Sequence, residues 1–102
     1  MKENFNSIIN GNEPVLVDFH ATWCGPCHTQ APILKDLAPN IKGKARIIKI
    51  DVDKNQALAQ KYQVRSIPTL ILFKNGVAVW RHSGVASKQE LLDVIKQHIS
   101  EP

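Results

Sequence analysis

The sequence predicts an α/β fold in which helices flank both faces of a mixed four-stranded sheet. Three observations lead to this prediction. Helical and strand-like segments alternate along the chain, the first connections are long enough for helical crossovers, and an Asn-Gly pair near the end is typical of a tight hairpin. Crossovers join parallel strands and a hairpin joins antiparallel ones, so the sheet is expected to be mixed. With 102 residues, 43% of them hydrophobic, the chain is expected to form one domain over residues 1–102.

The first half of the chain is expected to supply two helices and two strands. Residues 3–10 have apolar side chains at helical spacing and are followed by a glycine, which predicts a short helix. Residues 14–20 form a nearly continuous apolar run, typical of a strand buried on both faces. A helix is expected over 24–38, kinked at Pro32, and residues 45–52 alternate as a second strand.

The second half is expected to add a helix, a hairpin and a last helix. Asn55 is a candidate N-cap for the third helix, and residues 69–73 form a third apolar strand. The Asn-Gly pair at 75–76 predicts a two-residue turn, after which residues 77–82 return antiparallel. Residues 87–90, Ser-Lys-Gln-Glu, have the pattern of a capping box that begins the last helix.

Composition excludes several classes of function. The net charge of +4 is dispersed, without the basic stripe that nucleic-acid binding requires. No stretch approaches the roughly 18 consecutive apolar residues of a membrane helix, and the first residues have no apolar segment typical of a secretory signal. Both cysteines belong to one local motif, so no structural disulfides are expected, as in a reducing compartment. We therefore expect a cytoplasmic protein, and a monomer.

The motif Trp23-Cys24-Gly25-Pro26-Cys27 follows the first strand and contains the chain's only two cysteines. Two thiols at this spacing can form and break a disulfide, so thiol–disulfide exchange is the leading hypothesis. A free thiol with a pKa near 8.5 is only about 3% ionised at pH 7, but the N-terminus of a helix favours the thiolate of Cys24. Cys27, one turn further along, is expected to be less exposed and to attack the mixed disulfide formed on Cys24.

Two other interpretations of the pair remain open. A C-x-x-C pair can form half of a zinc site, but the chain has no second cysteine pair, and its four histidines lack the usual ligand spacing. The cysteines could also be inert and buried, which the intervening Gly25-Pro26 disfavours because these residues hold the two sulfurs close in a tight turn.

With these motifs in view, the chain resembles the thioredoxin family. The matching segments are Val17-Asp18-Phe19, Trp23-Cys24-Gly25-Pro26-Cys27, Ile67-Pro68-Thr69 and Phe73-Lys74-Asn75-Gly76. The resemblance implies a thioredoxin fold and a general protein-disulfide reductase, and nothing in the sequence indicates a bound cofactor. It also implies disulfide-containing proteins as substrates and an NADPH-dependent flavoprotein, thioredoxin reductase, as electron donor. In that scheme Cys24 is the nucleophile and Cys27 the resolving thiol.

Asp18 is a candidate general base. A carboxylate in an apolar strand is costly unless it is paired or protonated, so its pKa should be raised. Such a group can accept the proton of Cys27. The alternative is a structural acid hydrogen-bonded to Lys49, whose counterpart in the family lies beside this acid. Both interpretations can hold together.

The resemblance also implies a substrate-binding surface. It makes Pro68 a cis proline against the cysteine pair, with the backbone of Ile67 pairing with a bound substrate strand. Gly84 would allow a substrate backbone to approach closely. A flat apolar rim around Cys24 would consist of Trp23, Gly25, Pro26, Ile67, Val85 and Ala86.

Two histidines depart from the family pattern. His20 stands where tryptophan is usual, and His28 where lysine or arginine is usual. Either could titrate near neutral pH and tune the thiols. The simpler hypotheses are that His20 fills space and bonds an acid such as Asp53, and that His28 is a solvated helix residue.

Two classes of function follow. The first is a disulfide reductase that carries electrons, with an oxidase or isomerase as the alternative within the redox class. The second is a binding module whose redox turnover is incidental. The intact Cys24–Cys27 pair together with Asp18 favours the first, because a scaffold has no need of these groups.

Overall fold

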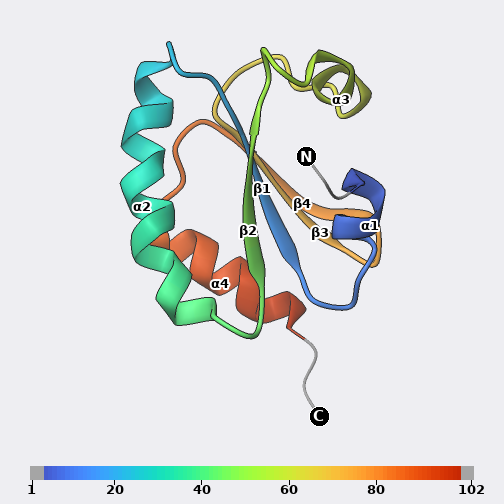
Figure 1. Cartoon of the computed structure of the whole chain (residues 1–102). Helices are drawn as coiled ribbons and strands as arrows, with labels where there is room; N and C mark the ends of the chain where they lie inside the picture. The colour runs from blue at the N-terminus through green and yellow to red at the C-terminus, as the bar shows by residue number, and fades with distance from the viewer. Residues whose placement is uncertain (1–3, 100–102) are drawn as a thin grey trace.

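The computed structural model describes residues 4–99, and its elements follow the predicted order (Figure 1). The helices are α1 (Phe5–Ile9), α2 (Gly25–Ile41), α3 (Gln56–Lys61) and α4 (Lys88–His98). The strands are β1 (Val15–His20), β2 (Arg46–Asp51), β3 (Thr69–Lys74) and β4 (Val77–Ser83). The predicted boundaries are therefore correct to within a few residues. Glu3, the first residue of the predicted N-terminal helix, lies outside the described residues.

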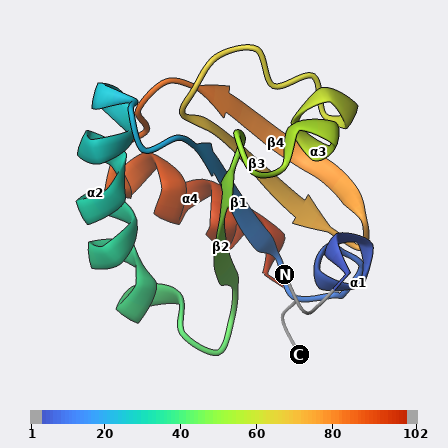
Figure 2. The ribbon, with the colours of Figure 1, turned by 45° about the horizontal axis from the view of Figure 1, so that its top comes forward.

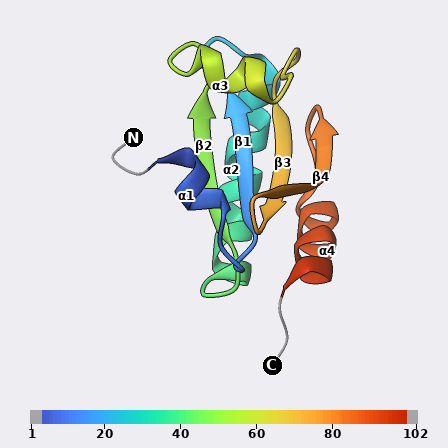
Figure 3. The same cartoon turned by 90° about the vertical axis from the view of Figure 1, so that its right-hand side faces the viewer.

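The four strands form one mixed sheet in the order β2-β1-β3-β4, as Figure 3 shows from left to right. Strand β1 runs parallel to β2 and antiparallel to β3, and β4 is antiparallel to β3. The register places Asp18 of β1 opposite Lys49 of β2. The predicted combination of parallel crossovers and a terminal hairpin is confirmed.

Each face of the sheet carries its own apolar core, because successive residues of β1 and β3 point to opposite faces. Helices α2 and α4 cover one face, and α1 and α3 lie on the other (Figure 1). The first core contains Leu16, Leu34, Leu37, Ile41, Leu70, Leu72, Leu91 and Ile95. The second contains Ile8, Ile9, Val15, Val17, Phe19, Ile50, Ile71 and Phe73. Strand β1 is therefore buried on both faces, as its sequence predicts.

Local signals account for most element boundaries. The Ser87 hydroxyl accepts a hydrogen bond from the Glu90 backbone N–H at 3.1 Å, which confirms the N-cap of α4. Asn75 and Gly76 have φ angles of 53° and 80°, as a two-residue hairpin turn requires. Asn55 occupies the N-cap position of α3, but its amide donates to the Asp51 carbonyl and makes no capping hydrogen bond. Within residues 4–99, no helix is both long enough and apolar enough to cross a membrane.

Candidate active site

The cysteine pair lies where β1 leads into α2, a connection visible in Figure 2. Cys24 is the N-cap of α2, with an extended backbone, and Cys27 lies in the first turn. The two form a disulfide with their Cα atoms 5.2 Å apart. The Cys27 backbone N–H also donates to the Cys24 Sγ at 3.2 Å. This N–H has no backbone partner within the helix and points at the Cys24 Sγ. It therefore favours negative charge on that sulfur.

The two cysteines are almost equally buried in this disulfide form. Cys24 is 4% exposed and Cys27 is 6% exposed. The expectation that Cys27 is the less exposed of the two is therefore wrong for the disulfide. Both residues pack in a small apolar cluster with Ala21, which leaves an incoming partner only a limited approach to either sulfur.

The Ile67–Pro68 segment lies against the disulfide. Its peptide bond is cis, which confirms the expectation from the family resemblance. The Ile67 carbonyl oxygen lies 3.6 Å from the Cys24 Sγ, and the Pro68 carbonyl accepts from the Gly84 N–H at 2.8 Å. Ile67, Pro68 and Gly84, which are far apart from Cys24 in sequence, are therefore brought together at one end of the sheet.

Most members of the expected apolar rim are accessible. Trp23 is 69% exposed and Val85 is 39% exposed, so neither is a core residue. The Trp23 indole N–H donates to Asp53 at 2.8 Å, a contact that no sequence motif indicates. Ala86 is fully buried, so its assignment to the exposed rim is wrong. The rim as the structure defines it consists of Trp23, Gly25, Pro26, Ile67 and Val85.

Asp18 is the buried carboxyl group of the site. It is 1% exposed, and neither carboxyl oxygen has a hydrogen-bond partner among the described residues. Burial raises the pKa of Asp18 from 3.8 to about 6, and the positive charge of Lys49 partly opposes this shift. The suggested hydrogen bond between Asp18 and Lys49 is absent from the described part of the chain. Lys49 acts through its charge from the adjacent strand position.

His20 and His28 lie in different surroundings. Burial and the charge of Lys49 lower the pKa of His20, and Asp51 partly opposes them. The acid that affects His20 is thus Asp51, whereas Asp53 accepts from Trp23. His28 is exposed, with its Nε2 2.8 Å from the Thr22 carbonyl oxygen, which agrees with a solvated helix residue.

The lowered pKa of His20 yields a first testable prediction. The imidazole is mainly neutral at pH 7, so His20→Trp removes no charge that titrates together with the thiols. We expect the pH profile of Cys24 alkylation by iodoacetamide, measured from about pH 5 to 9 on the reduced protein, to be the same in both proteins. A midpoint displaced by about half a pH unit or more would show that His20 does tune Cys24.

Gln30 is a site-adjacent residue that the sequence motifs do not identify. It is fully buried in α2, and its side chain bonds the backbone of Ala86. A signal was present in the sequence, because Gln30 falls within the helical stripe of buried residues Cys27, Leu34, Leu37 and Ile41. A polar residue within such a stripe needs a buried partner.

Comparisons with known proteins agree on one family. The sequence model of the Thioredoxin family matches residues 1–97. Thioredoxin of Haemophilus influenzae is 49% identical over 92 residues, which cover 90% of this chain and 86% of that protein. Thioredoxin of Staphylococcus aureus is 52% identical over 84 residues, with 82% and 81% covered. The structure of a mutant thioredoxin from Halobacterium salinarum is 40% identical, with a TM-score of 0.84, and the match covers 95% of this chain and 84% of that one.

Proposed function

This chain belongs to the thioredoxin family and is a thiol–disulfide oxidoreductase that reduces protein disulfides, and from that membership we propose how its residues divide the reaction. Cys24 is the nucleophile, Cys27 is the resolving thiol and Asp18 is the general base. The observation that carries the proposal is the Cys27 N–H aimed at the Cys24 Sγ at 3.2 Å, at the start of α2. This N–H and the helix N-terminus both favour the thiolate of Cys24 over that of Cys27.

The first step is attack of the Cys24 thiolate on a substrate disulfide. A bond forms between the Cys24 Sγ and one substrate sulfur, and the other substrate sulfur leaves as a thiolate that takes a proton from water. In the second step the Cys27 thiol loses its proton and attacks the Cys24 Sγ. The mixed disulfide breaks, the second substrate thiol is released, and the Cys24–Cys27 disulfide seen in the structure forms. The substrate gains two electrons and the protein loses two.

Asp18 is proposed to accept the proton of Cys27 in the second step, directly or through a water molecule. Its pKa of about 6 supports this role, because the carboxyl group is then mostly ionised at pH 7 and is still a better base than an ordinary aspartate. Lys49 contributes by limiting how far burial raises that pKa.

Extended protein segments are the proposed substrates. The exposed Trp23, Gly25, Pro26 and Val85 supply an accessible, largely apolar surface beside the disulfide. The backbone of Ile67 is proposed to pair with the substrate strand. Pro68 is buried. Gly84 leaves space for a substrate backbone, since apart from Gly84 and its two chain neighbours no atom lies within 4 Å of a Cβ built at that position.

The electron source and the compartment are also proposals. Thioredoxins are generally reduced by thioredoxin reductase, and we propose that this chain receives its electrons from such an NADPH-dependent flavoprotein. We further propose a single-domain, monomeric carrier in the cytoplasm. The use of both cysteines in one redox pair supports this location, because none remains for the structural disulfides common in oxidising compartments.

The reduction potential of the Cys24–Cys27 pair tests this function. We expect equilibration with a thiol redox buffer at pH 7 to give a value near or below about −250 mV, as a cytoplasmic reductant requires. This threshold reflects the range typical of reductants of the thioredoxin family. A value of about −180 mV or higher would instead indicate an oxidase or isomerase. Such a value would make His20 and His28 the first residues to replace.

A further inference from the structure

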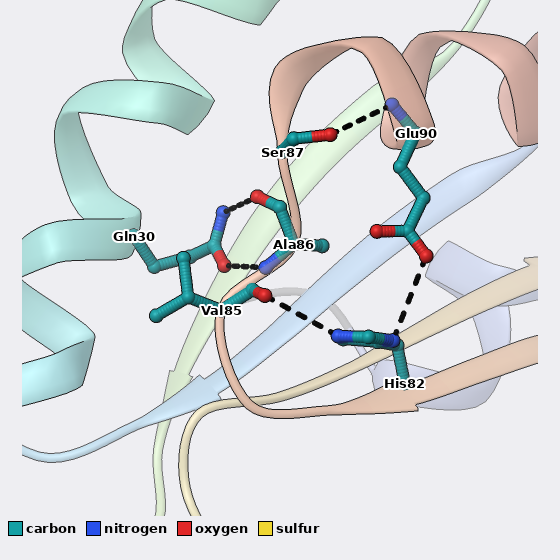
Figure 4. A network of polar contacts seen from close by, with 6 residues as sticks. All are labelled: Gln30, His82, Val85, Ala86, Ser87 and Glu90. Carbon is teal, nitrogen blue, oxygen red and sulfur yellow. Dashed lines mark hydrogen bonds and ion pairs between the residues drawn. The ribbon is translucent and has the colours of Figure 1, made fainter.

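Gln30 forms a two-point bridge between α2 and the segment that follows β4. Its Nε2 donates to the Ala86 carbonyl at 3.1 Å, and its Oε1 accepts from the Ala86 N–H at 2.8 Å (Figure 4). Gln30 and Ala86 are both 0% exposed. A buried side-chain amide that bonds both the backbone N–H and the backbone carbonyl of one residue holds that residue firmly. Breaking the two hydrogen bonds would leave several polar atoms buried without partners.

The bridge closes a ring of contacts around the disulfide. Gln30 lies three residues after Cys27, on the same side of α2. Ala86 follows Gly84 and Val85, and the Gly84 N–H donates to the Pro68 carbonyl at 2.8 Å. The residue before Pro68 places its carbonyl 3.6 Å from the Cys24 Sγ, which completes the ring. Ala86 also packs in the core with Leu34 of α2, and the bridge adds two directed hydrogen bonds to that apolar contact.

The segment over residues 84–87 is held at its end by the Ser87 cap of α4 and by the burial of the Ala86 side chain in the core. It is neither helix nor strand and connects β4 to α4. His82 places its Nε2 3.3 Å from the Val85 carbonyl oxygen, but this contact is longer and lies at the surface (Figure 4). The His82 ring is itself steadied by stacking on Trp80 and by Glu90, 3.7 Å from its Nδ1. The buried side-chain hydrogen bonds that the structure shows to this segment are therefore those of Gln30.

We propose that Gln30 is a positioning residue that fixes the location of Gly84 and Val85 relative to the Cys24–Cys27 pair. By doing so, it sets the affinity of the protein for extended protein substrates. This inference rests on the substrate-binding role proposed above for Val85 and Gly84. Gln30 itself is proposed to touch neither the substrate nor a sulfur atom. Its effect is expected in the binding of large substrates and not in the exchange chemistry.

The first test is Gln30→Met, which keeps the length of the side chain but removes both hydrogen bonds. We expect the KM for insulin, with dithiothreitol as reductant, to rise about threefold to tenfold while kcat is unchanged. The reduction rate of the small disulfide 5,5′-dithiobis(2-nitrobenzoate) should also be unchanged, because this probe makes little contact with the rim. Loss of kcat or of small-disulfide reduction would contradict a role limited to positioning.

A second variant, Gln30→Glu, adds a readout that simple packing would not produce. A neutral carboxyl group can reproduce both hydrogen bonds to Ala86, whereas a carboxylate has no donor and faces the Ala86 carbonyl. Burial raises the pKa of a carboxyl group, so the neutral form persists to higher pH. The ratio of the variant KM to the wild-type KM should therefore be near one at about pH 5 and rise toward pH 8. A ratio that does not change with pH would overturn the proposal.

Ile95→Val serves as the matched control for stability. Ile95 is buried in α4 within the core that also contains Ala86, and loss of one methyl group weakens the fold without removing a hydrogen bond to residues 84–87. Its KM for insulin should equal that of the wild type. Equal KM values for Gln30→Met and Ile95→Val would show a purely structural role for Gln30. A wild-type protein that failed to reduce insulin would instead overturn the proposed function, so the two failures are distinguishable.

Discussion

Replacing Cys27 with serine is expected to leave the protein covalently attached to its substrate. The Cys24 thiolate can still attack a substrate disulfide, but no second thiol is present to break the mixed disulfide. Turnover of insulin should fall to the background of the reductant alone. A stable adduct, reversed by dithiothreitol, should appear in the intact mass and on a non-reducing gel.

Cys24→Ser is the control for this experiment, because it also removes turnover but eliminates the proposed nucleophile. It should form no adduct. The two residues are almost equally buried, so exposure does not explain the difference, whereas the N–H donated to the Cys24 Sγ does. An adduct on Cys24→Ser together with none on Cys27→Ser would reverse the assigned roles.

Asp18→Asn is expected to make the protein more stable at neutral pH. Burial raises the pKa of Asp18 from 3.8 to about 6. Between these two pH values the carboxyl group is therefore protonated in the folded state but ionised in the unfolded state. The contribution of Asp18 to wild-type stability should therefore be greatest below about pH 4, fall between about pH 4 and 6, and remain lower above pH 6. The shift corresponds to a difference on the order of 3 kcal/mol at pH 7. Urea unfolding at several pH values measures it.

The same substitution is expected to slow catalysis. Without the carboxylate, Cys27 has no buried base to take its proton, and insulin reduction near pH 7 should fall by up to about a hundredfold. The rate of the wild type should rise with pH through about 6, whereas that of the variant should not. A gain in stability with unchanged turnover would make Asp18 a structural acid only. Unchanged stability together with unchanged turnover would remove it from both roles.

Local sequence signals predicted the fold well because they involve neighbouring residues. Ser87 and the Asn75-Gly76 pair act through backbone groups within a few positions, and the structure confirms both. The Asn55 cap failed even though its competitor is also close in sequence. The Asp51 carbonyl at the end of β2 competes for the Asn55 amide, and a propensity for capping does not include that competitor.

The candidate site was predicted only in part, because its geometry depends on contacts between distant segments. Cys24, Cys27 and Asp18 follow from their residue types and immediate surroundings. The bond from Trp23 to Asp53 and the burial of Ala86 depend on how loops far apart in the sequence pack. The cis bond before Pro68 came from the family resemblance, since the sequence of an X-Pro pair alone favours trans.

Strand β1 is synthesised first, but its antiparallel partner β3 comes much later. Phe19 pairs with Thr69, about fifty residues further along the chain. At a synthesis rate of about 5–20 residues per second, this separation corresponds to roughly 3–10 s. Throughout that interval β1, which is apolar on both sides, has no antiparallel neighbour to complete the centre of the sheet. The period in which a nascent chain is vulnerable to misassembly is therefore set by the distance between β1 and β3 along the chain, and not by the stability of the finished protein.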